Sequence, residues 1–130
     1  MDRKLLSDWV SAYERLWRTP GTDGLAELFA DDAFYSMGPF DREATGLEAI
    51  AELWEDERAS AAEPFEMQSE IVAVEGDTGV VRVEVRYGPP KNEHYKDLWV
   101  VSLDSEGRCV HFEEWPHWPG HGTAAGNGAG

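Results

Sequence analysis

Apolar residues in the first part of the chain recur at helical spacing. Between residues 3 and 19 they form one stripe, made of Leu5, Trp9, Ala12, Tyr13, Leu16 and Trp17. Asp2 is placed to cap the start of this helix, and Pro20-Gly21 is expected to end it. Tyr13 is the one phenol on the stripe, and a polar aromatic in such a place needs a hydrogen-bond partner or a ligand. Tyr13 is therefore the first candidate for a functional residue.

Two more helices and an early strand are expected before residue 55. Asp23 is placed to cap the second helix, whose residues Leu25, Leu28 and Phe29 would face inward. Thr45 precedes the third helix, and Glu48 follows three residues later as in a capping box. The expected bounds are residues 24–30 for the second helix, 33–37 for the strand and 46–54 for the third helix.

After Pro64 the apolar period changes to two, which is the spacing of a half-buried strand. The turns at 76–79 and 104–107 would join neighbouring strands as hairpins. The predicted strands are residues 65–75, 81–87, 93–103 and 108–115. The side chains expected to face inward are Val81, Val83, Val85, Tyr87, Tyr95, Asp97, Trp99, Val101 and Leu103.

The order of these elements predicts an α+β fold, in which three helices pack against one face of a mixed or antiparallel sheet. Residues 1–119 would form a single domain, and residues 120–130 a flexible, glycine-rich tail. Leu98 and Val100 lie on the face of their strand opposite the core, yet both are apolar. We therefore expect the outer face of the sheet to be covered by a second subunit, as in a homodimer.

The charge of the chain excludes several kinds of partner. Its 26 acidic and 11 basic residues give a formal net charge of −15 at pH 7, which argues against a nucleic-acid or anionic-membrane surface. Cys109 is the only cysteine, so no internal disulfide can form. No apolar stretch approaches the length of a membrane span, and the N-terminus leads into an amphipathic helix. The sequence thus predicts a cytoplasmic protein.

The histidines do not form a metal-binding motif. His94, His111, His117 and His121 are present, but no pair has the spacing of two ligands on one helix, and one cysteine adds little. We expect neither a metal nor a cofactor. His111 could still serve as an acid–base group, because the reference pKa of histidine lies near neutrality.

Three motifs resemble one known superfamily. They are Trp9-x-x-x-Tyr13 through Phe29-Ala30-Asp31-Asp32-Ala33, then Gly46-Leu47-Glu48-Ala49-Ile50, and finally Leu98-Trp99-Val100-Val101-Ser102-Leu103-Asp104-x-x-Gly107-Arg108. Their order and spacing resemble the nuclear-transport-factor-2-like superfamily, and within it the SnoaL-like branch of small polyketide cyclases. The resemblance implies a cone, made of a strongly curved sheet closed by helices around a pocket, and it implies dimerisation. It implies no single reaction, because one fold can carry many functions.

A more distant resemblance to ketosteroid isomerase implies roles for three positions. Tyr13 matches the tyrosine that donates to the developing oxyanion in that branch. The position of its neutral carboxylic acid is Trp99 here, and the position of its general base falls near Met37. Neither tryptophan nor methionine can do acid–base work, so the steroid-isomerase reaction does not carry over with the tyrosine.

Acidic side chains on the last two strands supply other candidates. Asp97 and Glu114 would form a carboxylate pair beside Tyr13, and burial in an apolar cone would raise a carboxyl pKa toward neutrality. Alternation does not decide between the two glutamates: Val110 and Phe112 favour Glu114 inside, whereas Cys109 and Trp115 favour Glu113. The side chains expected to shape the pocket are Trp17, Phe34, Met37, Trp54, Val83, Tyr95, Trp99 and Phe112.

The sequence supports two hypotheses about function. The first is a cofactor-independent isomerase, cyclase or dehydratase that acts on a small apolar carbonyl compound, with Tyr13, Asp97 and Glu114 as its catalytic residues. The alternative is a non-catalytic ligand-binding or dimeric interaction module whose pocket is a vestige, which Met37 and Trp99 favour. The stiff segment Trp115-Pro116-His117-Trp118-Pro119 could cover the pocket mouth, lie in a dimer interface, or simply pack against the sheet.

Overall fold

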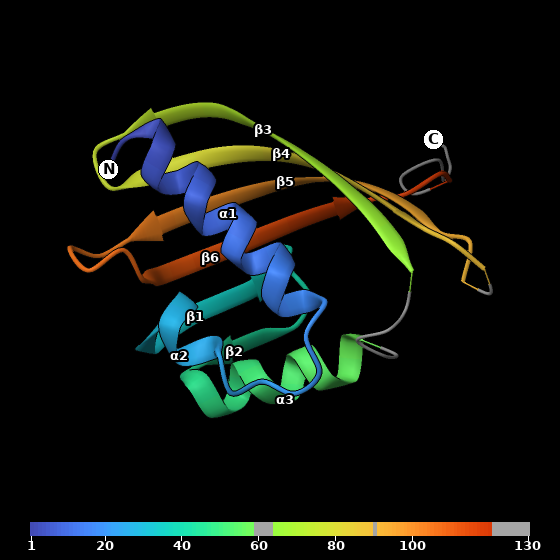
Figure 1. Cartoon of the computed structure of the whole chain (residues 1–130), viewed down its shortest axis with the longest axis horizontal. Helices are drawn as coiled ribbons and strands as arrows, with labels where there is room; N and C mark the ends of the chain where they lie inside the picture. Colours follow the sequence, from blue (N-terminus) through green and yellow to red (C-terminus); the bar gives the residue numbers. More distant parts are fainter. Residues whose placement is uncertain (59–63, 90, 121–130) are drawn as a thin grey trace.

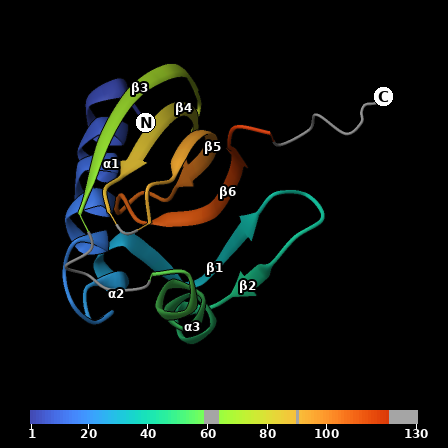
Figure 2. The ribbon, with the colours of Figure 1, turned by 90° about the vertical axis from the view of Figure 1, so that its right-hand side faces the viewer.

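The computed structural model describes residues 1–58, 64–89 and 91–120. Within them it confirms the α+β class, with helices on one side of a curved, mixed sheet (Figures 1 and 2). The predicted tail lies, except for Gly120, outside the described residues. The elements are α1 (Arg3–Trp17), α2 (Leu25–Leu28), β1 (Phe29–Met37), β2 (Glu43–Thr45), α3 (Leu47–Glu57), β3 (Phe65–Glu75), β4 (Thr78–Tyr87), β5 (His94–Leu103) and β6 (Cys109–His117).

The sheet runs in the order β2-β1-β6-β5-β4-β3. Neighbouring strands are antiparallel except β1 and β6, which are parallel, because the chain crosses from β1 to the far edge and returns strand by strand. Figure 1 shows α1 lying diagonally across the strands, and Figure 2 shows how the sheet curls around it. The sheet is thus open at the β2 and β3 edges, and its concave face looks toward the helices.

Helix α1 begins where the sequence predicts. Oδ1 of Asp2 accepts a hydrogen bond from the backbone N–H of Leu5 at 2.8 Å, as an N-cap should. The helix ends at Trp17, two residues earlier than expected. Leu5 was expected on the buried stripe, but it is 41% exposed and Leu6 is buried in its place. The buried face is Leu6, Trp9, Val10 and Tyr13, whose spacing of three and four residues keeps one side of the helix toward the sheet.

The predicted caps of the other two helices are wrong. Helix α2 starts after Gly24, without a side-chain cap from Asp23, and ends early because β1 already begins at Phe29. Helix α3 starts after Gly46, whose φ of +91° suits glycine. Thr45 belongs to β2, a short strand that the sequence did not reveal, and therefore makes no capping box. Helix α3 also continues to Glu57, three residues beyond its expected end.

Two irregularities in strand pairing decide which side chains face the core. In β6, His111 pairs with Ser102 and Cys109 pairs with Leu103, so Val110 is an extra residue. Because of this extra residue, Cys109 and Phe112 are both buried although they are three positions apart. Alternation from Phe112 then places Glu114, and not Glu113, on the inner face. A similar shift in β1 lies between Phe29 and Phe34.

The outer face of the sheet keeps part of its apolar surface exposed. Leu98 is 43% exposed and Val100 is half-buried, on the face away from α1. None of the helices and strands given above covers Leu98 on that face. Among the described residues, no helix is both long and apolar enough to span a membrane.

Candidate functional site

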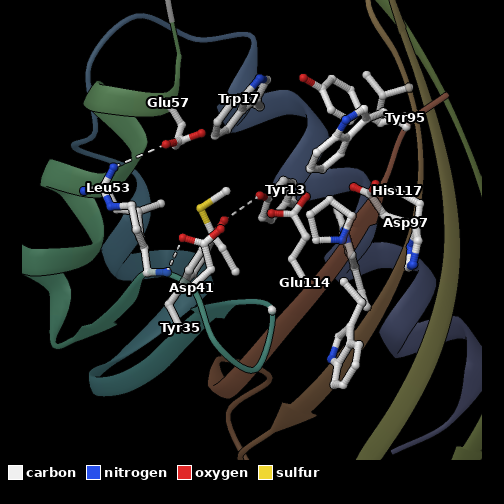
Figure 3. Close-up of a pocket in the computed structure, with 18 of the residues that line it drawn as sticks. Tyr13, Trp17, Tyr35, Asp41, Leu53, Glu57, Tyr95, Asp97, Glu114 and His117 are labelled. Carbon is white, nitrogen blue, oxygen red and sulfur yellow. Dashed lines mark hydrogen bonds and ion pairs between the residues drawn. The ribbon is translucent and has the colours of Figure 1, made fainter. Parts of the chain in front are cut away.

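A cavity of about 700 Å³ opens between the concave face of the sheet, the C-terminal half of α1 and the end of α3 (Figure 3). This volume lies within the usual range for small-molecule sites. Seven of the residues predicted from the sequence line it: Tyr13, Trp17, Met37, Tyr95, Asp97, Trp99 and Glu114.

Four of the predicted pocket residues do not line the cavity. Trp54, Val83 and Phe112 are fully buried in the core, where Trp54 packs edge-on against the ring of Tyr13 at 5.0 Å. Phe34 points to the opposite face of the sheet and stacks on His111 at 5.1 Å. The corrections have two causes: the strand register places Tyr35 rather than Phe34 inside, whereas Trp54, Val83 and Phe112 are packed in the core and do not reach the cavity.

Several lining residues were missed by the sequence reasoning, among them Tyr35 and Glu57. Tyr35 was missed because Phe34 was taken as inward, although alternation from Met37 places Tyr35 on the inner face. Glu57 was missed because α3 was expected to stop at Trp54. The continuing helical pattern of polar residues after Trp54 could have signalled the longer helix.

The hydroxyl groups of Tyr13 and Tyr35 are 3.0 Å apart and hydrogen-bonded to one another. Burial raises the pKa of Tyr13 well above its ordinary value, and the nearby Tyr35 and Glu114 raise it further. The pKa of Tyr35 is also raised well above normal, by burial first and then by Glu114. Both phenols therefore stay neutral near pH 7. When one donates to the other, the second hydroxyl keeps a proton that it can donate to a ligand.

Asp97 and Glu114 form a carboxyl pair on neighbouring strands. Trp99 is paired with Glu114 and Pro116 with Asp97, so the two acids are diagonal neighbours on the inner face. Figure 3 shows both directed into the cavity beside Tyr13. Burial raises the pKa of Glu114 well above its usual range, and a hydrogen bond to Asp97 and the charge of Asp97 raise it further. Burial also raises the pKa of Asp97.

The raised pKa values of both acids favour one proton on the pair, and the larger rise favours Glu114 as its holder. Asp97 is only 5% exposed, and its Oδ1 is buried without a hydrogen-bond partner among the described residues. A buried acceptor without a donor costs about 1–3 kcal/mol. A proton on Glu114 can supply a donor, because a side-chain hydrogen bond joins the two acids. Glu114 lies deep in the molecule, yet part of its side chain is open to the cavity, so a protonated Glu114 can also contact a ligand.

The register places Glu114 between two residues named by the resemblance to ketosteroid isomerase. Glu114 pairs with Met37 of β1 on one side and with Trp99 of β5 on the other. These are the positions at which that resemblance would put the general base and the neutral acid. Glu114 therefore places a carboxyl group between Met37 and Trp99, the two positions that lack the acid–base groups of that branch.

Charged residues near the end of α3 and on the loop after β1 complete the lining. Arg42 donates to Glu57 and to Asp56, each at 3.2 Å, so the positive charge of Arg42 is shared by two carboxylates. Lys91 lies over the ring of Tyr87 at 4.2 Å. Among the residues that the structure describes, no group of three or more His, Cys, Asp or Glu side chains could hold a metal ion.

The segment after Phe112 extends β6 to His117 and then borders the cavity. Trp115, Pro116, His117 and Trp118 all line it, which agrees with the hypothesis that this segment lies at the pocket mouth. Trp118 packs edge-on against Tyr95 with ring centres 6.0 Å apart.

We define the inner site as Tyr13, Tyr35, Asp97 and Glu114. It brings two neutral phenol donors and a carboxyl pair to one partly enclosed apolar cavity. Such a set can hold an oxygen atom of a ligand and exchange a proton with a nearby atom.

Comparison with known proteins agrees with this architecture. The family model described as SnoaL-like domain matches residues 10–112. A solved structure of a candidate polyketide cyclase from Sinorhizobium meliloti is 25% identical, covers 82% of this chain and 93% of that chain, and has a TM-score of 0.64. No curated protein matches the chain in sequence.

Two other solved structures share the fold at lower identity. The epoxide hydrolase/cyclase-like enzyme SalBIII, from pyran ring formation in the polyether salinomycin, is 15% identical with a TM-score of 0.69, over 89% of this chain and 93% of that one. A steroid delta-isomerase from Pseudomonas aeruginosa is 18% identical with a TM-score of 0.62, over 90% of this chain and 82% of that one.

Proposed function

The chain belongs to the SnoaL-like family, and from that premise we propose that its cavity binds a small, largely apolar carbonyl compound and acts on it by acid–base chemistry without a cofactor. The observation that carries this proposal is the inner site. Two phenols that stay neutral and a carboxyl pair whose pKa values are raised face the same cavity.

In the proposed reaction Tyr13 donates a hydrogen bond to the carbonyl oxygen of the ligand, supported by Tyr35 at 3.0 Å. Negative charge that develops on this oxygen is stabilised by the fixed donor in a cavity of low polarity. The desolvated aromatic wall, which includes Trp17 and Trp99, strengthens that interaction by excluding water.

The carboxyl pair moves the proton. The free oxygen of Glu114 takes a proton from the carbon next to the carbonyl, while Glu114 passes its own proton to Asp97. The electron pair of the broken C–H bond moves into the enolate, whose oxygen is held by Tyr13. Reversal of the relay returns a proton to another carbon, which gives isomerisation, or to a leaving hydroxyl group, which gives dehydration. Attack of the enolate on a second carbonyl would give cyclisation.

The alternative is a non-catalytic ligand-binding module with the same cavity. Met37 and Trp99 favour it, because they stand where the resemblance would place acid–base groups. An open cavity that holds Tyr13, Asp97 and Glu114 supports the catalytic hypothesis, since a vestigial pocket would be filled by its own side chains.

A homodimer through the outer sheet face is part of the proposal, since Leu98 keeps 43% of its surface exposed there. Light scattering at micromolar concentration should give the mass of two chains, and Leu98→Lys should reduce it to one. A cytoplasmic location also remains a prediction.

The test of the proposed chemistry does not need the natural substrate. In D₂O, the protein should accelerate exchange of the protons next to the carbonyl of 2-hexanone, followed by proton NMR. Glu114→Gln should slow the catalysed exchange about 100-fold, the lower end of the usual contribution of a general base. Glu113→Gln is the matched control, because Glu113 is the adjacent residue on the opposite face, and it should leave the rate unchanged. Absence of catalysed exchange, or equal rates in the two variants, would favour the non-catalytic module.

A further inference from the structure

Phe40 is the most exposed of the large apolar side chains in the described part of the chain, with a relative exposure of 100%. It stands on the loop of residues 38–42 between β1 and β2, and every residue of this loop lines the cavity. Figure 2 shows the loop projecting beyond the sheet. A phenylalanine that buries no surface adds nothing to folding, whereas exposed apolar groups at the edge of a pocket are typical of ligand contacts.

The loop keeps its shape without the ring of Phe40. At its base, the backbone N–H of Met37 donates to the carbonyl of Arg42 at 2.9 Å. Gly38 turns the chain with a φ of +89°, a conformation that favours glycine. Arg42 then ties the loop to the end of α3 through Glu57. The tip residue Phe40 is therefore held at the cavity by contacts in which its own side chain takes no part.

A second set of exposed aromatics borders the same cavity at the end of β6 and in the residues just after it. Trp118 is 46% exposed and Trp115 is 39% exposed, although both line the cavity. Trp118 is oriented by its edge-on packing against Tyr95, whose hydroxyl donates to Glu93 at 2.6 Å. Exposed rings thus lie at the opening on two separate elements, the β1–β2 loop and the end of β6.

We propose that Phe40 and Trp118 form an aromatic clamp for the outer part of a ligand that is longer than the cavity. The inner site holds the polar end, and an apolar tail passes through the opening between the two rings. The two regions are continuous, since one cavity is lined by Tyr13, Glu114, Phe40 and Trp118 together. The substrate class is then an elongated carbonyl compound with an apolar tail. The clamp requires that the cavity binds the ligand of the proposed function, but it does not require the proposed proton transfer.

Two methyl ketones of different length test the clamp by isothermal titration calorimetry. 2-Hexanone presents the same carbonyl as 2-undecanone but has a shorter tail. In the wild-type protein, 2-undecanone should bind more tightly, because each further methylene group that leaves water contributes about fourfold in affinity. Phe40→Ala and Trp118→Ala should each weaken binding of 2-undecanone about fivefold and change that of 2-hexanone less than about twofold.

Val72→Ala is the matched control, because Val72 is an exposed apolar residue, at 40% exposure, that does not line the cavity. It should leave both affinities unchanged. Phe40→Leu keeps an apolar side chain and should retain part of the preference for the longer ketone. Equal losses for both ketones in Phe40→Ala, or no loss for either, would overturn the clamp.

Two further outcomes separate the clamp from a dimer contact and from the proton chemistry of the inner site. If Phe40→Ala converts a dimer into a monomer in light scattering, the ring is covered by a second copy and the clamp is wrong. Tyr13→Phe should weaken both ketones equally, because it acts on the carbonyl. If Tyr13→Phe leaves both affinities unchanged while 2-undecanone still binds more tightly than 2-hexanone, the result would contradict the proposed function and support the clamp.

Discussion

The two faces of β6 put the same side chain into opposite environments. Glu114 points to the concave face, where burial raises its pKa well above the usual range, with the hydrogen bond and charge of Asp97 adding to the rise. Glu113, the preceding residue, points to the convex face. There, hydrogen bonds from Trp115 at 3.0 Å and from His111 at 2.8 Å lower its pKa. One residue along a strand thus separates a carboxyl group with a raised pKa from one with a lowered pKa.

The difference shows that position in the sheet, and not residue type, decides which acid can exchange protons near neutral pH. A general acid or base works best when its pKa lies near the working pH. Glu113 has donors for both of its oxygens and stays ionised. Glu114 has one acidic neighbour in an apolar cavity, and it keeps its proton until a ligand or a higher pH removes it.

The largest effect should come from breaking the carboxyl pair. Asp97→Asn removes the acceptor for the proton of Glu114, and catalysed exchange of 2-hexanone should fall about 100-fold. The substitution also removes the hydrogen bond and charge that raise the pKa of Glu114, so that this pKa should fall toward its ordinary value. The pH–rate profile should therefore move to lower pH. An unchanged profile in Asp97→Asn would show that the two acids do not act as a pair.

A smaller effect is expected from the phenol that faces the pair. Tyr13→Phe removes the donor to the ligand oxygen and leaves the Tyr35 hydroxyl, buried at 1% exposure, without its partner at 3.0 Å. Loss of one such hydrogen bond should weaken 2-hexanone binding about tenfold. Quenching of tryptophan fluorescence can follow binding, because Trp17 and Trp99 line the cavity. Equal affinity in the variant and the wild type would remove Tyr13 from the site.

The smallest expected effect is on the pH dependence of protein stability, in which Glu114 and Glu113 should act in opposite directions. Above pH 4.5 the unfolded chain releases the proton of Glu114 while the folded chain keeps it, so this group makes stability fall as pH rises, by up to about 1.4 kcal/mol per pH unit. Glu113 has the opposite sign: its lowered pKa adds stability as pH rises toward 4.5. Urea unfolding between pH 5 and 8 should show a smaller decline in Glu114→Gln than in the wild type.

In the same unfolding experiment Glu113→Gln should keep the decline of the wild type above pH 5. Relative to the wild type it should be less stable by a constant amount above pH 5, and this difference should disappear as the pH falls below the ordinary pKa of glutamate, because the stabilisation from a lowered pKa is lost there. Parallel curves for Glu114→Gln and the wild type would contradict a raised pKa for Glu114.

Much of the fold could be predicted from the sequence, because it depends on patterns of the chain itself. The period of α1, its Asp2 cap and the alternation along β4 and β5 all appear in the structure. Tyr13, Asp97 and Glu114 meet in one cavity because α1 and the paired strands β5 and β6 place them there. The family resemblance supplied the curvature that local patterns could not.

The errors arise where long-range pairing overrides a local pattern. The extra residue Val110 in β6 made both glutamates plausible. In β1 the error was to take Phe34 as inward, although the pairing with β6 places Tyr35 and Met37 on the inner face. Thr45 is a good capping residue by type, but pairing with Phe34 draws it into β2. Trp54 has the size and polarity of a pocket residue, yet it fills the space behind Tyr13. Register and bulges depend on contacts between distant residues, which one sequence does not show.

The most direct test of the shared proton is the protonation state of the two neighbouring glutamates at pH 7. Carbon-13 NMR of the labelled side-chain carboxyl groups, assigned with Glu114→Gln and Glu113→Gln, reports it for each residue. We expect the chemical shift of a protonated carboxyl for Glu114 and of a carboxylate for Glu113. A carboxylate shift at both positions would contradict the shared proton and, with it, the proposed relay.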